Sequence, residues 1–301
     1  MPRAAITGRV LRTVGGFYRI ALADGSTVDG RLSGRLRPGG ARDQQGPVLP
    51  GDRVTIEFSH STWIISDVMP RSTEMRRPAI ANVDLCVVVQ SITAPAPNLD
   101  MIDRTLIQAA YAGLASMICV SKADLGDKHS VAAFLEPYKR AGYAHVVTSA
   151  VLGIGVDELS QKLKDRIATL AGASGVGKSR LLNSICPEFN LAVGDISERA
   201  VRGRHTTRQV ELLKLPLGGW VADTPGFSTL HFGDMALREL PTTYPEFVQV
   251  SSACRFASCL HRGEPGCAVQ VAVDNGTIDA GRYQRYLRFA EEVEALEARR
   301  Y

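Results

Sequence analysis

The run Gly172–Ser179 restricts the fold of this chain more than any other feature of its sequence. It matches the pattern G-x-x-x-x-G-K-S, follows the apolar run Ile167–Ala171 and precedes apolar residues at helical spacing. A strand, a glycine-rich turn and a helix in this order allow backbone N–H groups to wrap a phosphate at a helix N-terminus. The sequence therefore predicts an α/β domain with a phosphate-binding loop. The residues of the loop are Gly172, Ala173, Ser174, Gly175, Val176, Gly177, Lys178 and Ser179.

Side chains in and after this loop have predictable tasks at a nucleoside triphosphate. Lys178 would reach the β- and γ-phosphates and is a candidate catalytic residue, whereas the Ser179 hydroxyl would ligate Mg²⁺. Asp223, at the end of the apolar segment Trp220–Ala222, could hold Mg²⁺ directly or through water. The N–H group of Gly226 could approach the γ-phosphate. An Asp-x-Pro-Gly turn is common on its own, but after a phosphate loop it is the expected partner.

The segment Ser121–Asp124, which follows the apolar run Met117–Val120, points to guanine as the base. The carboxylate of Asp124 could accept hydrogen bonds from the ring N1–H and the exocyclic amine of guanine, a donor pair that adenine lacks. The aliphatic stem of Lys122 would lie along the base plane. The first residue of such a segment is usually Asn or Thr, so the shorter side chain of Ser121 weakens the prediction of guanine specificity.

The order of these segments along the chain is unusual. In an ordinary small GTPase the phosphate loop comes first, and the guanine-reading Lys-x-Asp follows the Asp-x-x-Gly. Here Ser121–Asp124 precedes the phosphate loop, and Asp223–Gly226 follows it. Between the first two, Ser149 and Ala150 fit a loop that contacts the guanine carbonyl through main-chain N–H groups, although a plain turn at a strand end is an equal alternative. The order predicts a circularly permuted GTPase domain.

A second group of polar residues lies near the C-terminus, where three cysteines and one histidine have the spacing C-x4-C-x-H-x5-C. Three thiolates and one imidazole form a closed tetrahedral set for one structural Zn²⁺. The alternative, a disulfide with one thiol left over, is disfavoured in the reducing cytosol. The predicted ligands are Cys254, Cys259, His261 and Cys267, while Cys86, Cys119 and Cys186 lie in apolar runs and are predicted to be buried.

Composition places the chain among globular proteins of two or three domains. It has 301 residues, 45% of them hydrophobic, and no stretch of the sequence approaches a membrane span. Met1–Gly8 lacks a secretory hydrophobic region, so we expect a cytoplasmic protein with no membrane partner. The net charge of +4 is only mildly basic. Binding to nucleic acid would therefore need local clusters such as Arg199–Arg208, although most clusters of this kind are solvated basic faces.

Residues 1–70 predict an RNA-binding barrel of the OB type. Alternating runs are separated by turns that contain Gly and Pro, and about five strands of even spacing suit this fold. Another small β-barrel or a β-sandwich is the alternative. The clearest runs are Thr7–Thr13, Phe17–Leu22, Ser26–Leu32 and Arg53–Phe58.

Residues 71–230 begin with a basic linker, Arg71–Pro78, and continue with strands that alternate with helices, which predicts a mostly parallel sheet. Residues 231–301 are expected to form a zinc-binding domain that ends in a charged helix over Ala280–Arg300. The elements predicted for the middle region are Val83–Gln90, a helix near Leu99–Ala112, Met117–Ser121, a helix near Val131–Arg140, and Val146–Ser149.

In its motif order, its segment Gly203–Arg208 and its Cys/His spacing, the chain resembles the ribosome small-subunit-dependent GTPase family of bacteria over essentially its whole length. The resemblance implies a late maturation factor of the small (30S) ribosomal subunit. Such a factor converts GTP to GDP slowly alone and faster on the subunit, and its OB barrel and zinc domain contact 16S ribosomal RNA. We also expect a monomer.

The resemblance assigns further roles within Gly203–Arg208. Thr207 would ligate Mg²⁺ in the GTP state and so belong to the catalytic set, with the adjacent Thr206 as its competitor. Phe227 stands where Ras-like enzymes place the glutamine that orients water, and an apolar ring cannot perform that task. The family points instead to His205 as the residue that positions the attacking water. The alternative is a histidine that contacts RNA or solvent.

Two other functions fit parts of the sequence. One is a permuted GTPase that acts on another RNA or ribosomal partner, such as the large subunit. The other is a zinc-dependent RNA-binding module with a vestigial nucleotide site, against which the intact Lys178, Ser179 and Asp223 argue. Because Asp223–Phe227 leads directly into the predicted zinc domain, we also hypothesise that the nucleotide state biases how that domain is held.

Overall fold

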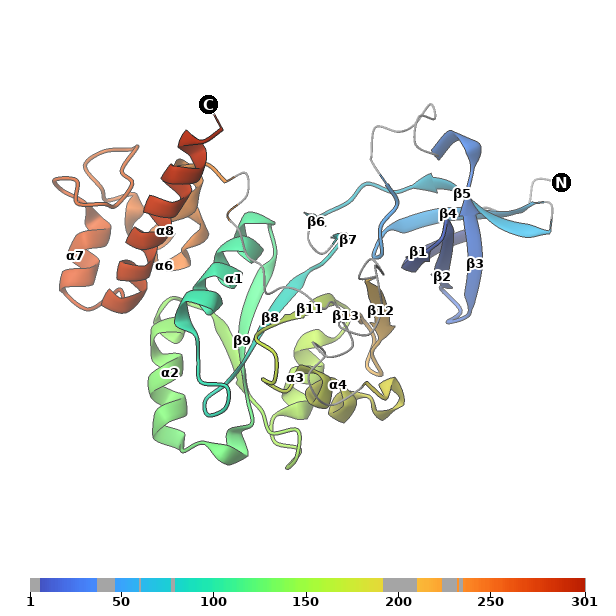
Figure 1. Ribbon diagram of the computed structural model, residues 1–301, viewed down its shortest axis with the longest axis horizontal. Helices are drawn as coiled ribbons and strands as arrows, with labels where there is room; N and C mark the ends of the chain where they lie inside the picture. Colours follow the sequence, from blue (N-terminus) through green and yellow to red (C-terminus); the bar gives the residue numbers. More distant parts are fainter. Residues whose placement is uncertain are drawn as a thin grey trace. The chain divides into compact units, whose positions relative to one another are not determined.

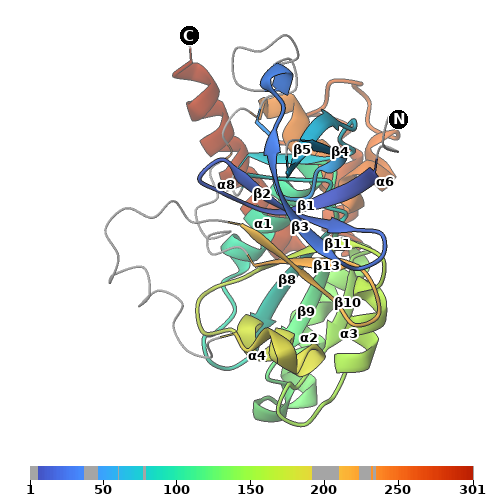
Figure 2. The same ribbon diagram turned by 90° about the vertical axis from the view of Figure 1, so that its right-hand side faces the viewer.

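The computed structural model of this chain describes residues 6–36, 47–59, 61–76, 79–191, 210–223, 232 and 235–300 (Figure 1, Figure 2). Contacts within the chain divide it into two compact units. The first comprises Met1–Leu85, Leu163–Leu170 and Ile196–Phe227, and the second comprises Cys86–Lys162, Ala171–Asp195 and Ser228–Tyr301. The domain limits expected at residues 70 and 230 remain predictions.

The first unit contains a closed β-barrel. Its strands are β1 (Ile6–Val14), β2 (Phe17–Leu22), β3 (Thr27–Leu32), β4 (Arg53–Ser59) and β5 (Thr62–Val68), hydrogen-bonded in the order β1-β2-β3-β5-β4, and a short 3-10 turn, η1 (Gly34–Leu36), follows β3. β3 and β5 are parallel, whereas the other neighbouring pairs are antiparallel. Inward-facing residues such as Val10, Ile20 and Ile65 fill the interior. The predicted five-stranded, OB-like barrel is confirmed, and closure of the sheet excludes the sandwich alternative.

The segment predicted as a basic linker is instead tied to the turn that precedes β4. Arg71 donates hydrogen bonds to both carboxylate oxygens of buried Asp52, each at 2.8 Å. Gly51 has a φ of +95°, and a Cβ at this position would lie 1.9 Å from the carbonyl oxygen of Ala81, so only glycine fits. The short strands that follow Arg71 pair as an antiparallel two-stranded sheet, β6 (Glu74–Arg76) with β7 (Ala79–Ala81).

A six-stranded sheet has the order β10-β9-β8-β11-β13-β12. Its strands are β8 (Leu85–Ser91), β9 (Ala115–Ser121), β10 (Ala144–Val147), β11 (Ile167–Ala171), β12 (Glu211–Lys214) and β13 (Trp220–Asp223). β9 and β10 are parallel, as are β11 and β13, whereas β12 runs antiparallel to β13. Every residue of β8 and β11 is buried, as expected for inner strands of a parallel sheet. The prediction of a mostly parallel α/β sheet is confirmed.

Three of the described helices begin directly after a capping side chain. Asn98 accepts a hydrogen bond from the Met101 N–H at 3.0 Å, and Asp279 accepts one from the Arg282 N–H at 2.8 Å. The helices are α1 (Leu99–Tyr111), α2 (Lys128–Arg140), α3 (Val156–Leu163), α4 (Lys178–Ile185), α6 (Pro245–Ser251), α7 (Ala268–Asp274) and α8 (Ala280–Ala298), with 3-10 turns η3 (Ala123–Leu125), η4 (Pro187–Phe189) and η5 (Leu237–Thr243). The helices predicted near residues 99–112, 131–140 and 280–300 are confirmed.

The C-terminal module, residues 235–300 of the second unit, has an aromatic core between η5, α6, α7 and α8. The Phe247 ring lies with its centroid 4.8 Å from those of Tyr244 and Tyr286. Ile107 of α1 belongs to the same core, so the module packs on this helix. Among the helices that the structure describes, none is long and apolar enough to cross a membrane.

Candidate nucleotide site and metal centre

The phosphate loop has the predicted strand, turn and helix around it. β11 ends at Ala171, α4 begins at Lys178, and the glycines between them have positive φ angles. Gly172 lies so close to β8 that a Cβ would come within 2.2 Å of the Val89 carbonyl oxygen. Ser174 and Gly175 are exposed at the top of the loop, whereas Val176 is buried below it. The loop therefore presents its backbone outward at the N-terminus of α4.

Lys178 lies across this loop. Its Nζ donates hydrogen bonds to the carbonyl oxygens of Gly172 and Ala173, both at 2.8 Å. The ammonium group is therefore held beside the outward-facing backbone, where a phosphate would need it. Ser179, the predicted Mg²⁺ ligand, follows in the first turn of α4 and is half-buried.

The predicted base loop, which begins at Ser121–Asp124, is joined to the phosphate loop by a side chain. Ser121, at the end of β9, is 4% exposed, and its Oγ donates to the Val176 carbonyl oxygen at 2.6 Å. The Ser121 hydroxyl therefore reaches the phosphate loop without the amide of an Asn. The structure thus brings together two segments that are far apart in the sequence.

Lys122, Asp124 and Ser149 also meet at this site. Lys122 has a φ of +55°, and its Nζ donates to the Ala94 carbonyl oxygen at 2.6 Å. Asp124 is exposed, and its Oδ1 accepts a hydrogen bond of 2.5 Å from the Ser149 hydroxyl. The Ser149 side chain thus holds the predicted base-reading carboxylate, a contact that the sequence did not suggest, whereas its main-chain role remains a prediction. Ala150 follows it in a half-buried turn.

The loop between β8 and α1, residues 92–98, was not predicted to belong to the site. Ala94 accepts the hydrogen bond from Lys122, and a Cβ at Gly175 would lie 3.8 Å from Cδ of Pro95. The loop therefore touches both the base loop and the phosphate loop. The signal that could have identified it is its place after the carboxyl end of a parallel strand, where ligands of α/β sheets bind.

Several predicted residues lie outside the described part of the chain. These are the basic segment 199–208, with His205, Thr206 and Thr207, and the residues after β13, with Gly226 and Phe227. Asp223 ends β13, and only its backbone is described. The roles expected of these residues remain predictions.

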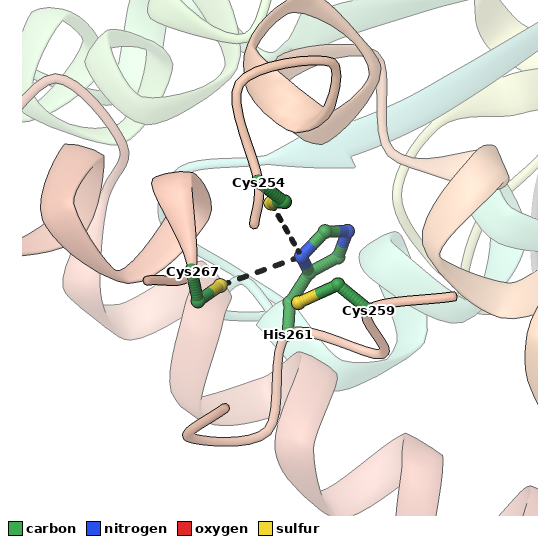
Figure 3. Close-up of side chains that lie close together, drawn as sticks. All are labelled: Cys254, Cys259, His261 and Cys267. Atoms are coloured by element: carbon green, nitrogen blue, oxygen red, sulfur yellow. Dashed lines mark hydrogen bonds between the residues drawn. The ribbon is translucent and has the colours of Figure 1, made fainter. Parts of the chain in front are cut away.

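The four predicted zinc ligands converge in the C-terminal module (Figure 3). The Sγ atoms of Cys254, Cys259 and Cys267 and a ring nitrogen of His261 all lie within 4.8 Å of one another. The His261 Nδ1 is 3.4 Å from the Sγ of Cys267 and 3.7 Å from that of Cys254. Tetrahedral Zn²⁺, with bonds of about 2.3 Å to sulfur and about 2.0 Å to nitrogen, separates such atoms by roughly 3.6 Å. The donor set and its spacing therefore fit Zn²⁺.

The backbone around the four ligands is fixed by hydrogen bonds of the kind that orient metal ligands. The Ala268 N–H, in the first turn of α7, donates to the Sγ of Cys254 at 3.3 Å, and the Tyr283 hydroxyl donates to the His261 carbonyl at 2.8 Å. The carboxylate of Glu264 accepts from two backbone N–H groups of the loop, each at 2.7 Å. None of the six cysteines forms a disulfide in this structure.

Burial affects the protonation of this group when no metal charge is present. It raises the pKa of the Cys259 thiol to about 12 and lowers the pKa of His261. A neutral imidazole is the form that binds metals, whereas a buried thiol needs a nearby positive charge to ionise. A bound divalent cation would supply that charge.

Comparisons with known proteins agree with this geometry. The family model of the RsgA GTPase matches residues 68–233. The small ribosomal subunit biogenesis GTPase RsgA of Moorella thermoacetica is 45% identical over 291 residues, which cover 96% of this chain and 98% of the relative. The protein of the same name from Caldanaerobacter subterraneus subsp. tengcongensis is 40% identical over 297 residues, 98% of each chain.

Two crystal structures resemble this chain over nearly its whole length. YjeQ from Thermotoga maritima superposes with a TM-score of 0.83 at 32% identity, covering 96% of this chain and 99% of YjeQ. YloQ, described as a circularly permuted GTPase, superposes with a TM-score of 0.80 at 31% identity, covering 97% of this chain and 96% of YloQ. The predicted permuted fold is therefore confirmed.

Proposed function

This chain belongs to the RsgA family of small ribosomal subunit biogenesis GTPases, and we propose that the 30S subunit stimulates its hydrolysis of GTP while its barrel and its C-terminal module bind 16S ribosomal RNA. Like its curated relatives it is a GTPase. The observation that carries our assignment of the nucleotide site is the hydrogen bond between Ser121 and Val176. This bond holds a base-reading loop at a fixed distance from a phosphate loop, as one nucleotide spanning both loops requires.

At the base end, Asp124 would accept hydrogen bonds from the N1–H and the amine of guanine. Its carboxylate is exposed, and the Ser149 hydroxyl holds one oxygen. Adenine has no matching donor pair, so ATP would leave this carboxylate unpaired beneath the base. Lys122, held by Ala94, would cover one face of the base with its stem.

At the phosphate end, the loop N–H groups and the Lys178 ammonium would bind the β- and γ-phosphates. Ser179, with Thr207 by family resemblance, would hold Mg²⁺, which neutralises charge on these phosphates when bound. Asp223 would support the ion from the end of β13. His205 would position the attacking water, because Phe227 has no polar atom for that task.

The outer face of the barrel supports binding to RNA. Phe17 on β2 is 46% exposed, and the guanidinium carbon of Arg31 on β3 lies 4.4 Å from its ring centroid. Exposed Val14 is the cross-strand partner of Phe17 on β1. OB barrels bind oligonucleotides on this face, and unpaired bases stack on aromatic rings and on guanidinium planes. We assign this face to unpaired bases of the ribosomal RNA.

The C-terminal module supports a second RNA contact. Phe256, between the first two predicted zinc ligands, is 44% exposed, and the Arg255 guanidinium carbon lies 5.5 Å from its ring centroid. One structural Zn²⁺ held by the Cys/His cluster would fix the loop that carries this pair. Zinc knuckles bind RNA bases with similar exposed rings.

The test is hydrolysis of GTP and of ATP by the purified protein, alone and with 30S or 50S subunits. We expect slow turnover of GTP alone, a clear increase with 30S only, and no turnover of ATP. An equal increase with 50S, or no increase at all, would reject the proposed partner and leave the GTPase assignment standing. ATP turnover equal to that of GTP would reject the base assignment. We expect a monomer, acting in the cytoplasm where small subunits assemble.

A further inference from the structure

One face of helix α1 is bound to helix α8 by charged side chains. Asp100 pairs with Arg288 at 2.7 Å, and Arg104 pairs with Glu292. Asp100 and Arg104 are four residues apart, so they lie on the same face of α1. This row of ion pairs joins the GTPase helix to the last helix of the C-terminal module, within one compact unit.

Asp103, in the middle of this row, is the buried centre of the junction. It is 1% exposed, and both of its oxygens are used. Oδ1 accepts from the Arg282 guanidinium and Oδ2 from the Nε of Arg285, each at 2.5 Å. Arg282 also donates to Glu246 of α6 at 2.7 Å. A buried carboxylate with two guanidinium partners fixes one arrangement of the two helices, because any other arrangement leaves a charge unpaired.

The loop before α1 carries this restraint to the nucleotide site. It holds Lys122 through the Ala94 carbonyl at 2.6 Å. Ile92 fits against the base loop so closely that a Cβ at Gly126 would lie 2.3 Å from its Cγ2. The loop ends at Asn98, the N-cap of α1. Displacing α1 along α8 would therefore displace the carbonyl that holds Lys122.

We propose that Asp103 is a positioning residue for guanine-nucleotide binding: it fixes α1 against α8 and thereby holds the loop that sets Lys122. The inference rests on the proposed role of Lys122 at the base. It gives the C-terminal module a route to the nucleotide site through packed helices, in addition to the covalent link through Asp223–Phe227. Because linkage is reciprocal, a partner that shifts this module changes nucleotide affinity, and the nucleotide changes affinity for the partner by the same factor.

The test measures the Kd of a fluorescent GDP analogue and the kcat of intrinsic GTP hydrolysis in the full-length protein without ribosomes. Asp103→Asn removes the charge at nearly the same volume. We expect it to raise Kd by about five- to tenfold, within the usual range of coupling between sites, with kcat close to that of the unmodified chain. We expect a smaller increase in Kd for Arg288→Asp. Arg288→Lys keeps the positive charge and should bind the analogue with the Kd of the unmodified chain.

Folding is monitored by melting temperature and metal content. If Asp103→Asn does not fold, the Kd of the Arg288→Asp variant tests the proposal instead. The Arg288 side chain is 59% exposed, so this change should leave folding intact. Lys162→Asp on α3 is the matched control, since it reverses a charge in an exposed ion pair away from the junction. An unchanged Kd in the folded junction variants, or an equal rise in the control, would overturn the proposal. Stimulation by 30S plays no part in this experiment, so its outcome is independent of the ribosomal partner.

Discussion

At the scale of single residues, a hydroxyl joins the two ends of the nucleotide site. We predict that Ser121→Ala raises the Kd for GDP about tenfold, because a buried carbonyl that loses its donor costs about 1 to 3 kcal/mol, and about 1.4 kcal/mol is a factor of ten. Ser121→Thr keeps the hydroxyl and should bind GDP like the unmodified chain. The measurement is titration with a fluorescent GDP analogue. Equal affinities of all three proteins would show that the bond does not support binding.

His205 is the second residue with a distinct prediction. His205→Ala should abolish the increase in GTP turnover caused by 30S subunits and leave the Kd for GTP nearly unchanged, because a water-positioning group acts in the hydrolytic step and not in binding. Exposed His129 on α2 supplies the control variant, His129→Ala. Stimulated turnover that persists in His205→Ala would assign the positioning of water to another group.

The sequence predicted the site at this scale wherever the chemistry is local. Gly172 and Lys178 belong to one continuous pattern, so their roles could be inferred before the fold was known. The bond between Ser121 and Val176 joins residues 55 positions apart. The contact of Ala94 with Lys122 depends in the same way on how the chain folds, and no spacing rule predicts it.

At the scale of elements, the Cys/His cluster orders the loop before α7. We predict one zinc ion per chain, and we expect Cys267→Ser to lose most of it. The melting temperature should fall by roughly 5–10 °C, because a closed four-ligand site contributes directly to folding. Elemental analysis and thermal unfolding measure both effects. Cys86→Ala, in the buried strand β8, is the control that should retain the metal. A metal-free protein that melts at the same temperature would contradict a structural role.

The second prediction at this scale concerns the barrel. Phe17→Ala should weaken binding to single-stranded fragments of 16S ribosomal RNA by about tenfold, because stacking of a base on an aromatic ring contributes about 1 to 3 kcal/mol. Phe17→Trp keeps a ring and should bind, with its fluorescence quenched by the stacked base. Tyr111→Ala removes an exposed ring from α1 and serves as the control. Equal binding by Phe17→Ala would place the RNA elsewhere.

The elements themselves were predicted where their patterns are long. The strand Phe17–Leu22 and the helix α1 lie within a residue of their expected ends. Short elements such as β12 (Glu211–Lys214) and α7 were missed, because four to seven residues do not establish a period. Arg71 was assigned to a linker because a basic residue near Pro suggests exposure. Its partner Asp52 lies in a turn 19 residues earlier, so the sequence gives no sign that the two residues pair.

At the scale of the whole molecule, the order of motifs could be read from the sequence, whereas the way the modules are connected could not. The motif order predicts that Asp223–Phe227, the segment expected next to the γ-phosphate, leads directly into the zinc-binding region. The structure adds a junction between α1 and α8 inside the second unit. That junction needed tertiary structure, because Asp103 and Arg285 are 182 positions apart.

The buried pair of arginines on α8 also has a consequence for how the protein is made. α1 leaves the translating ribosome early, but both guanidinium partners of Asp103 lie in the last helix, Ala280–Ala298. A chain that stops short of this helix leaves Asp103 without either partner, so α1 lacks the ion pairs that fix it in the complete protein. Only a finished polypeptide closes the junction. Prematurely terminated chains would therefore be exposed to proteases and removed before they could occupy an immature subunit.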